Sequence, residues 1–85
     1  HYAIEDYLTA ISHSPWEAHY MMHLARVYEE NYMRLASSRT IEKNIEETTY
    51  LIGLYKQILI LDDRNPWFWN YLYLFQHIRN WLFSN

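Results

Sequence analysis

The chain has 85 residues, with one Gly, two Pro, no Cys, 19% aromatic residues and a formal net charge of −3. One glycine excludes the phosphate loop and the dinucleotide fingerprint, and the absence of Cys excludes disulfides and thiolate metal sites. The seven Lys and Arg residues are spread along the sequence, so we expect no direct binding of nucleic acid, which requires clustered cations. A chain of this mass exposes about 5,500 Å² when folded, which suits one compact domain.

The sequence contains several motifs typical of helix starts. Asn-Gly or Asp-Gly hairpin turns and alternating β-branched runs, which would indicate strands, are missing. The motif Ser14-Pro15-Trp16-Glu17 is typical of a helix start, with a capping Ser, Pro at the first helical position and a Glu that can close a capping box. Thr40 and Asn65-Pro66 are similar starts further along. We expect an all-α fold of about four antiparallel helices, arranged as helical hairpins or as a four-helix bundle. The predicted helices span residues 2–12, 15–36, 40–61 and 66–83.

The organisation of the chain is predicted to be a single helical domain over residues 1–85. The chain begins at His1 rather than Met, and we interpret it as a piece of a longer protein. Its longest apolar segment, Trp67 to Phe83, is interrupted by polar residues and is too short to cross a bilayer comfortably. We therefore expect no membrane span, and an intracellular location in the cytoplasm or nucleus.

The two middle helices are predicted to be amphipathic. Gly53 lies inside the third, where it either permits close approach of another helix or is a neutral surface residue. On the second helix, Arg26–Glu30 and Glu30–Arg34 are candidate ion pairs. The predicted core stripe of the second helix is Trp16, Tyr20, Leu24, Val27/Tyr28 and Leu35, and that of the third is Ile41, Ile45, Thr48, Ile52, Tyr55 and Leu59.

The last helix is apolar over more of its circumference than one core-facing side requires. Two stripes run along it: Trp67, Tyr71, Leu74, Ile78 and Trp81 form one, and Phe68, Leu72, Phe75 and Leu82 form the other. The surplus surface either packs between further helices or receives a partner segment. The candidate partner-binding residues are Phe68, Trp69, Tyr73, Phe75 and Gln76, with Tyr20 on the second helix.

A short motif occurs twice in the chain: Ser14-Pro15-Trp16 followed by Tyr20 recurs 51 positions later as Asn65-Pro66-Trp67 followed by Tyr71. Such an internal repeat is typical of helical-repeat proteins. Tyr55, Leu61-Asp62, Trp69 and Leu72 have consensus-like spacing within residues 55–76. This stretch resembles the tetratricopeptide (TPR) repeat and its relative, the half-a-tetratricopeptide (HAT) repeat. Leu51, Ile58 and Tyr73 occupy positions where TPRs have small residues, so we expect a looser or differently angled helix packing. The resemblance implies stacked helical hairpins that act as a non-catalytic scaffold, HAT modules often within RNA-processing complexes.

His19 and His23 are the candidate metal ligands, since residues four apart project from the same side of a helix. The sequence lacks the Glu of the zinc-protease motif and any Glu-x-x-His pair. We expect these histidines to lie on a solvated surface, and we predict no metal, no cofactor and no enzymatic activity. Our hypothesis is a helical-repeat module that binds a protein or peptide. The alternative is a self-associating four-helix bundle that serves as a structural subunit of a complex.

Overall fold

The structure, a computed structural model, describes residues 2–84 and the side chains from Ile4 onward. No strand occurs in this part of the chain, and the prediction of an all-α fold with about four helices is confirmed. A short 3-10 helix, η1, follows the second α-helix. The bounds are α1 Tyr2–His13, α2 Ala18–Leu35, η1 Ala36–Ser38, α3 Ile41–Leu61 and α4 Pro66–Ser84.

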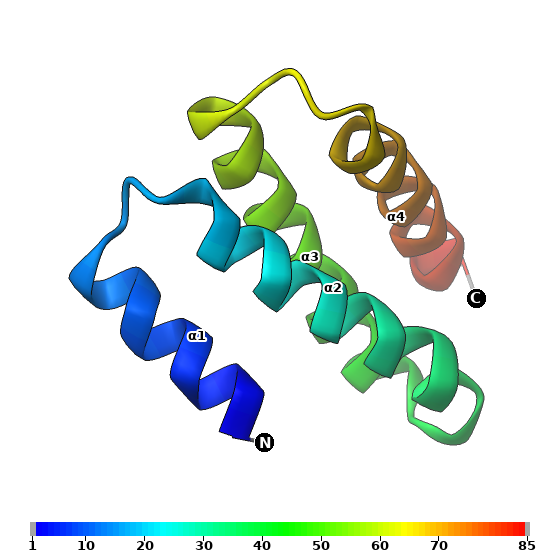
Figure 1. The fold of residues 1–85 in the computed structure, drawn as a ribbon. Helices are drawn as coiled ribbons and strands as arrows, with labels where there is room; N and C mark the ends of the chain where they lie inside the picture. The colour runs from blue at the N-terminus through cyan, green and yellow to red at the C-terminus, as the bar shows by residue number, and fades with distance from the viewer. Residues whose placement is uncertain (1, 85) are drawn as a thin grey trace.

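The helices pack mainly in chain order, α1 on α2, α2 on α3 and α3 on α4 (Figure 1). Within the described residues α1 makes no extensive contact with α4, so the four helices do not close into a bundle. The molecule is flat, with extents of 38 × 28 × 16 Å, and α1 and α4 form its opposite edges. Each edge helix therefore has a side that no other helix of the chain covers.

The core lies where α2, α3 and α4 meet, and Tyr55 of α3 is at its centre. The Tyr55 ring lies 6.0 Å from the rings of both Phe68 and Phe75, and the Tyr32 ring of α2 packs edge-on against Phe75 at 5.4 Å. From α1, Ile11 packs against this core only partly buried. The total accessible surface of 5747 Å² agrees with the value expected for this mass.

Two of the three predicted helix starts are confirmed by side-chain caps. The Lys43 amide donates to Thr40 Oγ1 at 3.2 Å, and the Trp67 amide donates to Asn65 Oδ1 at 3.0 Å. Each bond satisfies a backbone donor that the first helical turn leaves unpaired.

The predicted start of the second helix is wrong, because α2 begins at Ala18 rather than at residue 15. The Ser14 amide donates to Ala10 O at 2.9 Å, which extends the hydrogen bonding of α1 through Ser14. Ser14 to Glu17 then forms a turn, in which the Glu17 amide donates to Ser14 O at 3.0 Å. Glu17 takes the N-cap position without a side-chain cap bond, so the capping box does not form.

The core-facing side of α2 also differs from the prediction. Leu24 is buried as expected, but Trp16 lies in the turn and is 66% exposed. Glu29 is buried instead, and the Tyr55 hydroxyl of α3 donates a hydrogen bond that offsets the cost of burying its carboxylate. The buried residues of α2 are Met21, Leu24, Ala25, Glu29 and Tyr32.

The predicted stripe of α3 is largely confirmed. Thr48, Ile52, Tyr55 and Leu59 are buried, whereas Ile41 is exposed at the first turn. Gly53 lies on the exposed side, and a Cβ placed on it would meet no atom within 4 Å. Gly53 therefore does not serve the close approach of another helix in this chain.

Candidate functional site

The two apolar stripes of α4 have different roles in the structure. Phe68, Leu72, Phe75 and Leu82 all face the core. Phe68 is 3% exposed and Phe75 is 0% exposed, and both rings pack on Tyr55. The prediction that these two residues contact a partner is therefore corrected, because the fold of the chain itself covers them.

The other predicted residues of α4 lie outside the core, on the side of the helix next to α3. The Trp69 and Tyr73 rings stack with their centroids 6.3 Å apart, and Tyr73 is 62% exposed. The Trp69 indole donates from Nε1 to Asp63 O at 2.8 Å, which ties the ring to the α3–α4 turn. Gln76 follows Tyr73 on the next turn and is half-buried. Trp69 and Tyr73 thus form an exposed aromatic row, and the half-buried Gln76 continues the same side of α4.

A shallow hollow of about 400 Å³ lies beside this row, between α3 and α4. We call it the α3/α4 groove, and its lining residues are Lys56, Leu59, Ile60, Trp69 and Leu72. Ile60 is 74% exposed, an unusual degree for a large aliphatic side chain. Among the described residues Lys56 has no ion-pair partner, and it is the one charged residue in the lining. The groove is thus apolar with a single cation at its rim.

Tyr20, the remaining predicted residue, belongs to a different part of the molecule. It is half-buried on α2, and its ring lies 4.2 Å from the His19 ring of the same helix. The structure therefore joins Trp69, Tyr73 and Gln76 on one surface and leaves Tyr20 outside it.

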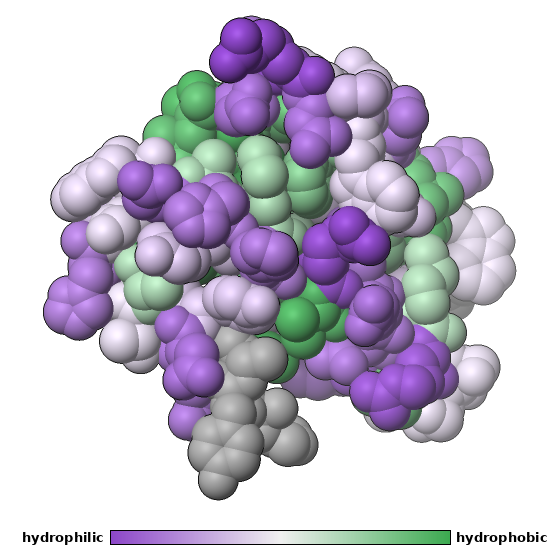
Figure 2. All heavy atoms as spheres, in the orientation of Figure 1, coloured by the Kyte–Doolittle hydropathy of each residue, from purple (hydrophilic) through white to green (hydrophobic). Residues whose placement is uncertain are grey.

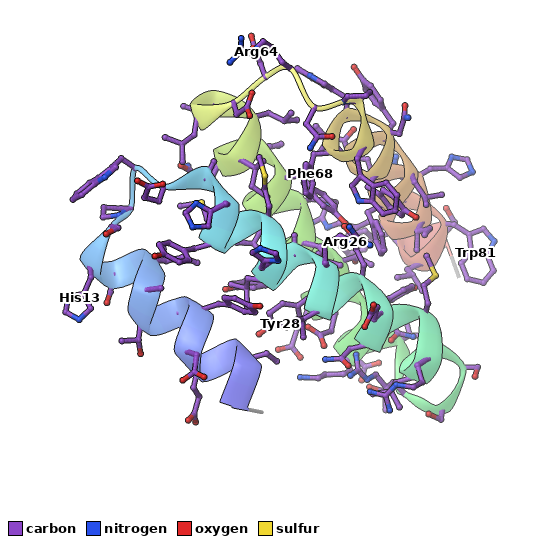
Figure 3. The ribbon with its side chains drawn as sticks, in the orientation of Figure 1. His13, Arg26, Tyr28, Arg64, Phe68 and Trp81 are labelled. Carbon is purple, nitrogen blue, oxygen red and sulfur yellow. The ribbon has the colours of Figure 1, made fainter. Side chains whose placement is uncertain are left out.

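A second hollow, of about 420 Å³, lies between α2 and α4 on the face shown in Figure 2, and we call it the α2/α4 groove. Green and near-white side chains, those of apolar and intermediate hydropathy, gather in that view along the α4 edge beside polar residues. Arg26 lies with its guanidinium carbon 4.3 Å from the centroid of the Trp67 ring, a cation–π contact across the groove (Figure 3). Arg26 Nε is also 3.6 Å from Glu29 Oε1.

Glu29 forms the floor of the α2/α4 groove and is 5% exposed. The Tyr55 hydroxyl donates to Glu29 Oε2 at 2.7 Å. Burial raises the pKa of Glu29, while the hydrogen bond from Tyr55 and the charge of Arg26 act in the opposite direction. Burial and the neighbouring Glu29 raise the pKa of Tyr55 far above its usual range, so Tyr55 stays a hydrogen-bond donor.

Sequence reasoning missed this buried pair. Glu29 and Tyr55 are 26 residues apart, and Glu29 stands next to a second glutamate, Glu30, in the sequence. The expected i,i+4 pair of Arg26 with Glu30 is replaced by an i,i+3 contact with Glu29. Only the packing of α2 on α3 selects which of the two glutamates becomes buried.

The two candidate metal ligands have other neighbours. The His19 and His23 rings meet edge to face at 6.5 Å, His19 Nδ1 lies 3.2 Å from Glu17 Oε2, and His23 stacks on Tyr7 at 5.5 Å. Within the described part of the chain, no three His, Asp or Glu side chains are placed to hold a metal ion.

Known proteins give no further guide to the site. No family model matches the chain, and no curated protein or solved structure is significantly similar to it. None of the described helices is both long and apolar enough to cross a membrane.

Proposed function

We propose that the chain is a non-catalytic protein-interaction module of helical-repeat type, which binds a helical segment of another protein in the α3/α4 groove. The observation that carries this proposal is the exposure of Ile60 and Trp69 around one apolar hollow, with the exposed Tyr73 stacked on Trp69. Large contiguous apolar surfaces on small proteins mark interaction sites more often than isolated exposed residues do.

The aromatic row has the properties of an interaction anchor. Trp and Tyr are over-represented among the residues that dominate binding energy, because their large rings bury much area at little entropic cost. Trp69 is already oriented by its hydrogen bond to Asp63 O, and Tyr73 stacks on it. A partner therefore meets a surface whose side chains have lost part of their freedom before binding.

The charges around the groove indicate the chemistry of the partner. Lys56 is the one charged residue that lines the groove. An amphipathic helix with an aliphatic face and a flanking carboxylate complements this surface: the aliphatic face fills the groove and the carboxylate pairs with Lys56.

The resemblance to TPR and HAT repeats supports the same function. Tyr55 and Leu72, two of the residues that carry it, are both buried where α3 packs on α4. In an array of such hairpins the uncovered side of the last helix receives the next element. In this chain the uncovered side of α4 faces away from α3 (Figure 1), so it is a surface separate from the α3/α4 groove.

The experiment is a selection of helical peptides from an unbiased display library on the purified chain, followed by calorimetric titration of the tightest peptide. We expect the selected peptides to combine an aliphatic face with Asp or Glu. Tyr73→Ala and Ile60→Ser should each weaken binding about tenfold, which is typical of anchor residues.

The matched control is Trp16→Ala, which removes an equally exposed aromatic residue from the α1–α2 turn. Equal weakening by this control, or unchanged binding to Tyr73→Ala, contradicts the proposal. Light scattering supplies a second check: a dimer that persists on dilution and dissociates in Tyr73→Ala would assign the groove to a second copy of the chain instead.

A further inference from the structure

A cavity of about 600 Å³ lies between Ile4 of α1, the end of α2 and the start of α3. Arg34 lines both this cavity and the α2/α4 groove, and the two hollows share no other lining residue. Three of the chain's seven Lys and Arg residues line it: Arg34 from α2, Arg39 from the turn after η1, and Lys43 from the first turn of α3. All three lie within residues 34–43, and the turn between α2 and α3 places them around one space. We call this space the basic cavity.

The positive charge of the basic cavity is only partly neutralised by the protein. Glu47 is the one acidic residue in the lining, and its Oε1 accepts a 2.8 Å bond from Nη1 of Arg39, with both side chains largely buried. Arg34 donates to the neutral Asn31 Oδ1 at 2.9 Å. Within residues 4–84, neither Arg34 nor Lys43 has an ion-pair partner, although Glu46 borders Lys43 in an adjoining surface hollow.

Two further features suit an anion. Lys43 lies in the first turn of α3, where the helix dipole adds positive potential. Tyr28 also lines the cavity, and burial together with the charge of Glu47 raises the pKa of this phenol, which keeps it protonated. Tyr28 can therefore donate a hydrogen bond inside the cavity.

The remaining wall is aliphatic, formed by Ile4, Val27 and Leu35. A cavity of this volume is in the range that holds small organic molecules, and its mixture of an apolar wall with a few convergent polar groups is typical of such sites. Inorganic ions alone would leave the aliphatic wall without a partner.

We propose that the basic cavity binds a small organic anion, a phosphate monoester or a carboxylate. Its anionic group lies between Arg34 and Lys43, and its apolar body packs on Ile4, Val27 and Leu35. This site is separate from the α3/α4 groove, and its test does not depend on the proposed protein partner.

The test is calorimetric titration of the whole chain with four probes: phenyl phosphate, benzoate, inorganic phosphate and the uncharged benzyl alcohol. We expect saturable binding of phenyl phosphate or benzoate, weaker binding of inorganic phosphate, and none of benzyl alcohol. Which of the first two binds more tightly assigns the anionic group. The double variant Arg34→Gln/Lys43→Gln should weaken that binding at least tenfold, and raised salt should weaken it as well.

The control variant is Arg64→Gln, which removes an exposed cation from the distant α3–α4 turn and should leave the affinity unchanged. Nuclear Overhauser effects between the ring of the bound probe and the methyl groups of Ile4 and Val27 place the ligand independently of any variant. Equal binding of benzyl alcohol, equal weakening by Arg64→Gln, no saturable binding, or inorganic phosphate that binds as tightly as phenyl phosphate would each overturn the proposal.

Discussion

The hydrogen bond between Tyr55 and Glu29 is the residue-scale feature that most affects the account of the fold. A carboxylate inside a small helical core is unfavourable unless donors satisfy it. Here the Tyr55 hydroxyl and Arg26 both face Glu29, and the Tyr55 ring simultaneously fills the core between Phe68 and Phe75. The Tyr55 side chain thus packs in the apolar core with its ring and stabilises the Glu29 carboxylate below the α2/α4 groove with its hydroxyl.

Tyr55→Phe should lower the free energy of unfolding by about 1–3 kcal/mol, because it removes the donor and leaves a buried acceptor unsatisfied. Tyr73→Phe is the matched control, since its hydroxyl lies on an exposed side chain and its loss should change stability little. Urea unfolding of the two variants measures the difference. Equal effects of the two substitutions would show that the hydrogen bond to Glu29 does not stabilise the fold.

Glu29 should also make stability depend on pH. Its pKa in the folded chain lies above the unfolded value of 4.5, so the folded state holds the proton more tightly. The free energy of unfolding should therefore fall as the pH rises from about 4.5 through the raised pKa of Glu29. Glu29→Gln should flatten this part of the profile, measured by thermal unfolding across the range. An unchanged slope in the variant would assign the pH dependence to other groups.

At the scale of elements, Gly53 is the clearest point of improvement in α3. Gly53→Ala should raise the free energy of unfolding by about 0.5–1 kcal/mol, because alanine restricts the unfolded chain and the added methyl group meets nothing within 4 Å. Chemical denaturation measures the change. A destabilised Gly53→Ala would mean that another helix approaches this face in solution.

The sequence predicted the elements well where local chemistry decides them. Thr40 and Asn65 cap their helices as expected, since a capping bond involves only residues two or three positions apart. The Ser14 cap failed because the Ser14 amide remains bonded to Ala10 O in the last turn of α1. A capping motif directly after another helix therefore does not fix where the next one starts.

The candidate site was predicted only in part, because α4 is apolar on more than one side. Both of its apolar stripes have helical spacing, so periodicity alone cannot show which one packs on α3. The structure buries the stripe that contains Phe68 and Phe75 and leaves Trp67 and Trp81 of the other stripe exposed. Trp69 and Tyr73, which are also exposed, belong to neither stripe. Glu29 could not be assigned to the core because its partner Tyr55 is distant in sequence.

At the scale of the whole molecule, the helices do not close into a bundle, which explains why apolar surface of α4 remains exposed. A closed bundle would bury both sides of α4 against neighbours, whereas this flat arrangement leaves α4 at an edge (Figure 1). The α3/α4 groove and the basic cavity lie in different parts of the fold, so a protein segment and a small anion would not compete for the same residues.

The most direct test of the central claim, that the α3/α4 groove is the protein-binding surface, is NMR titration of the isotope-labelled chain with the selected helical peptide. We expect the amide signals of Lys56, Ile60 and Tyr73 and the indole signal of Trp69 to shift most, and the amide signals of α1 to stay unchanged. Shifts confined to α1 or to the α2/α4 groove would contradict this claim.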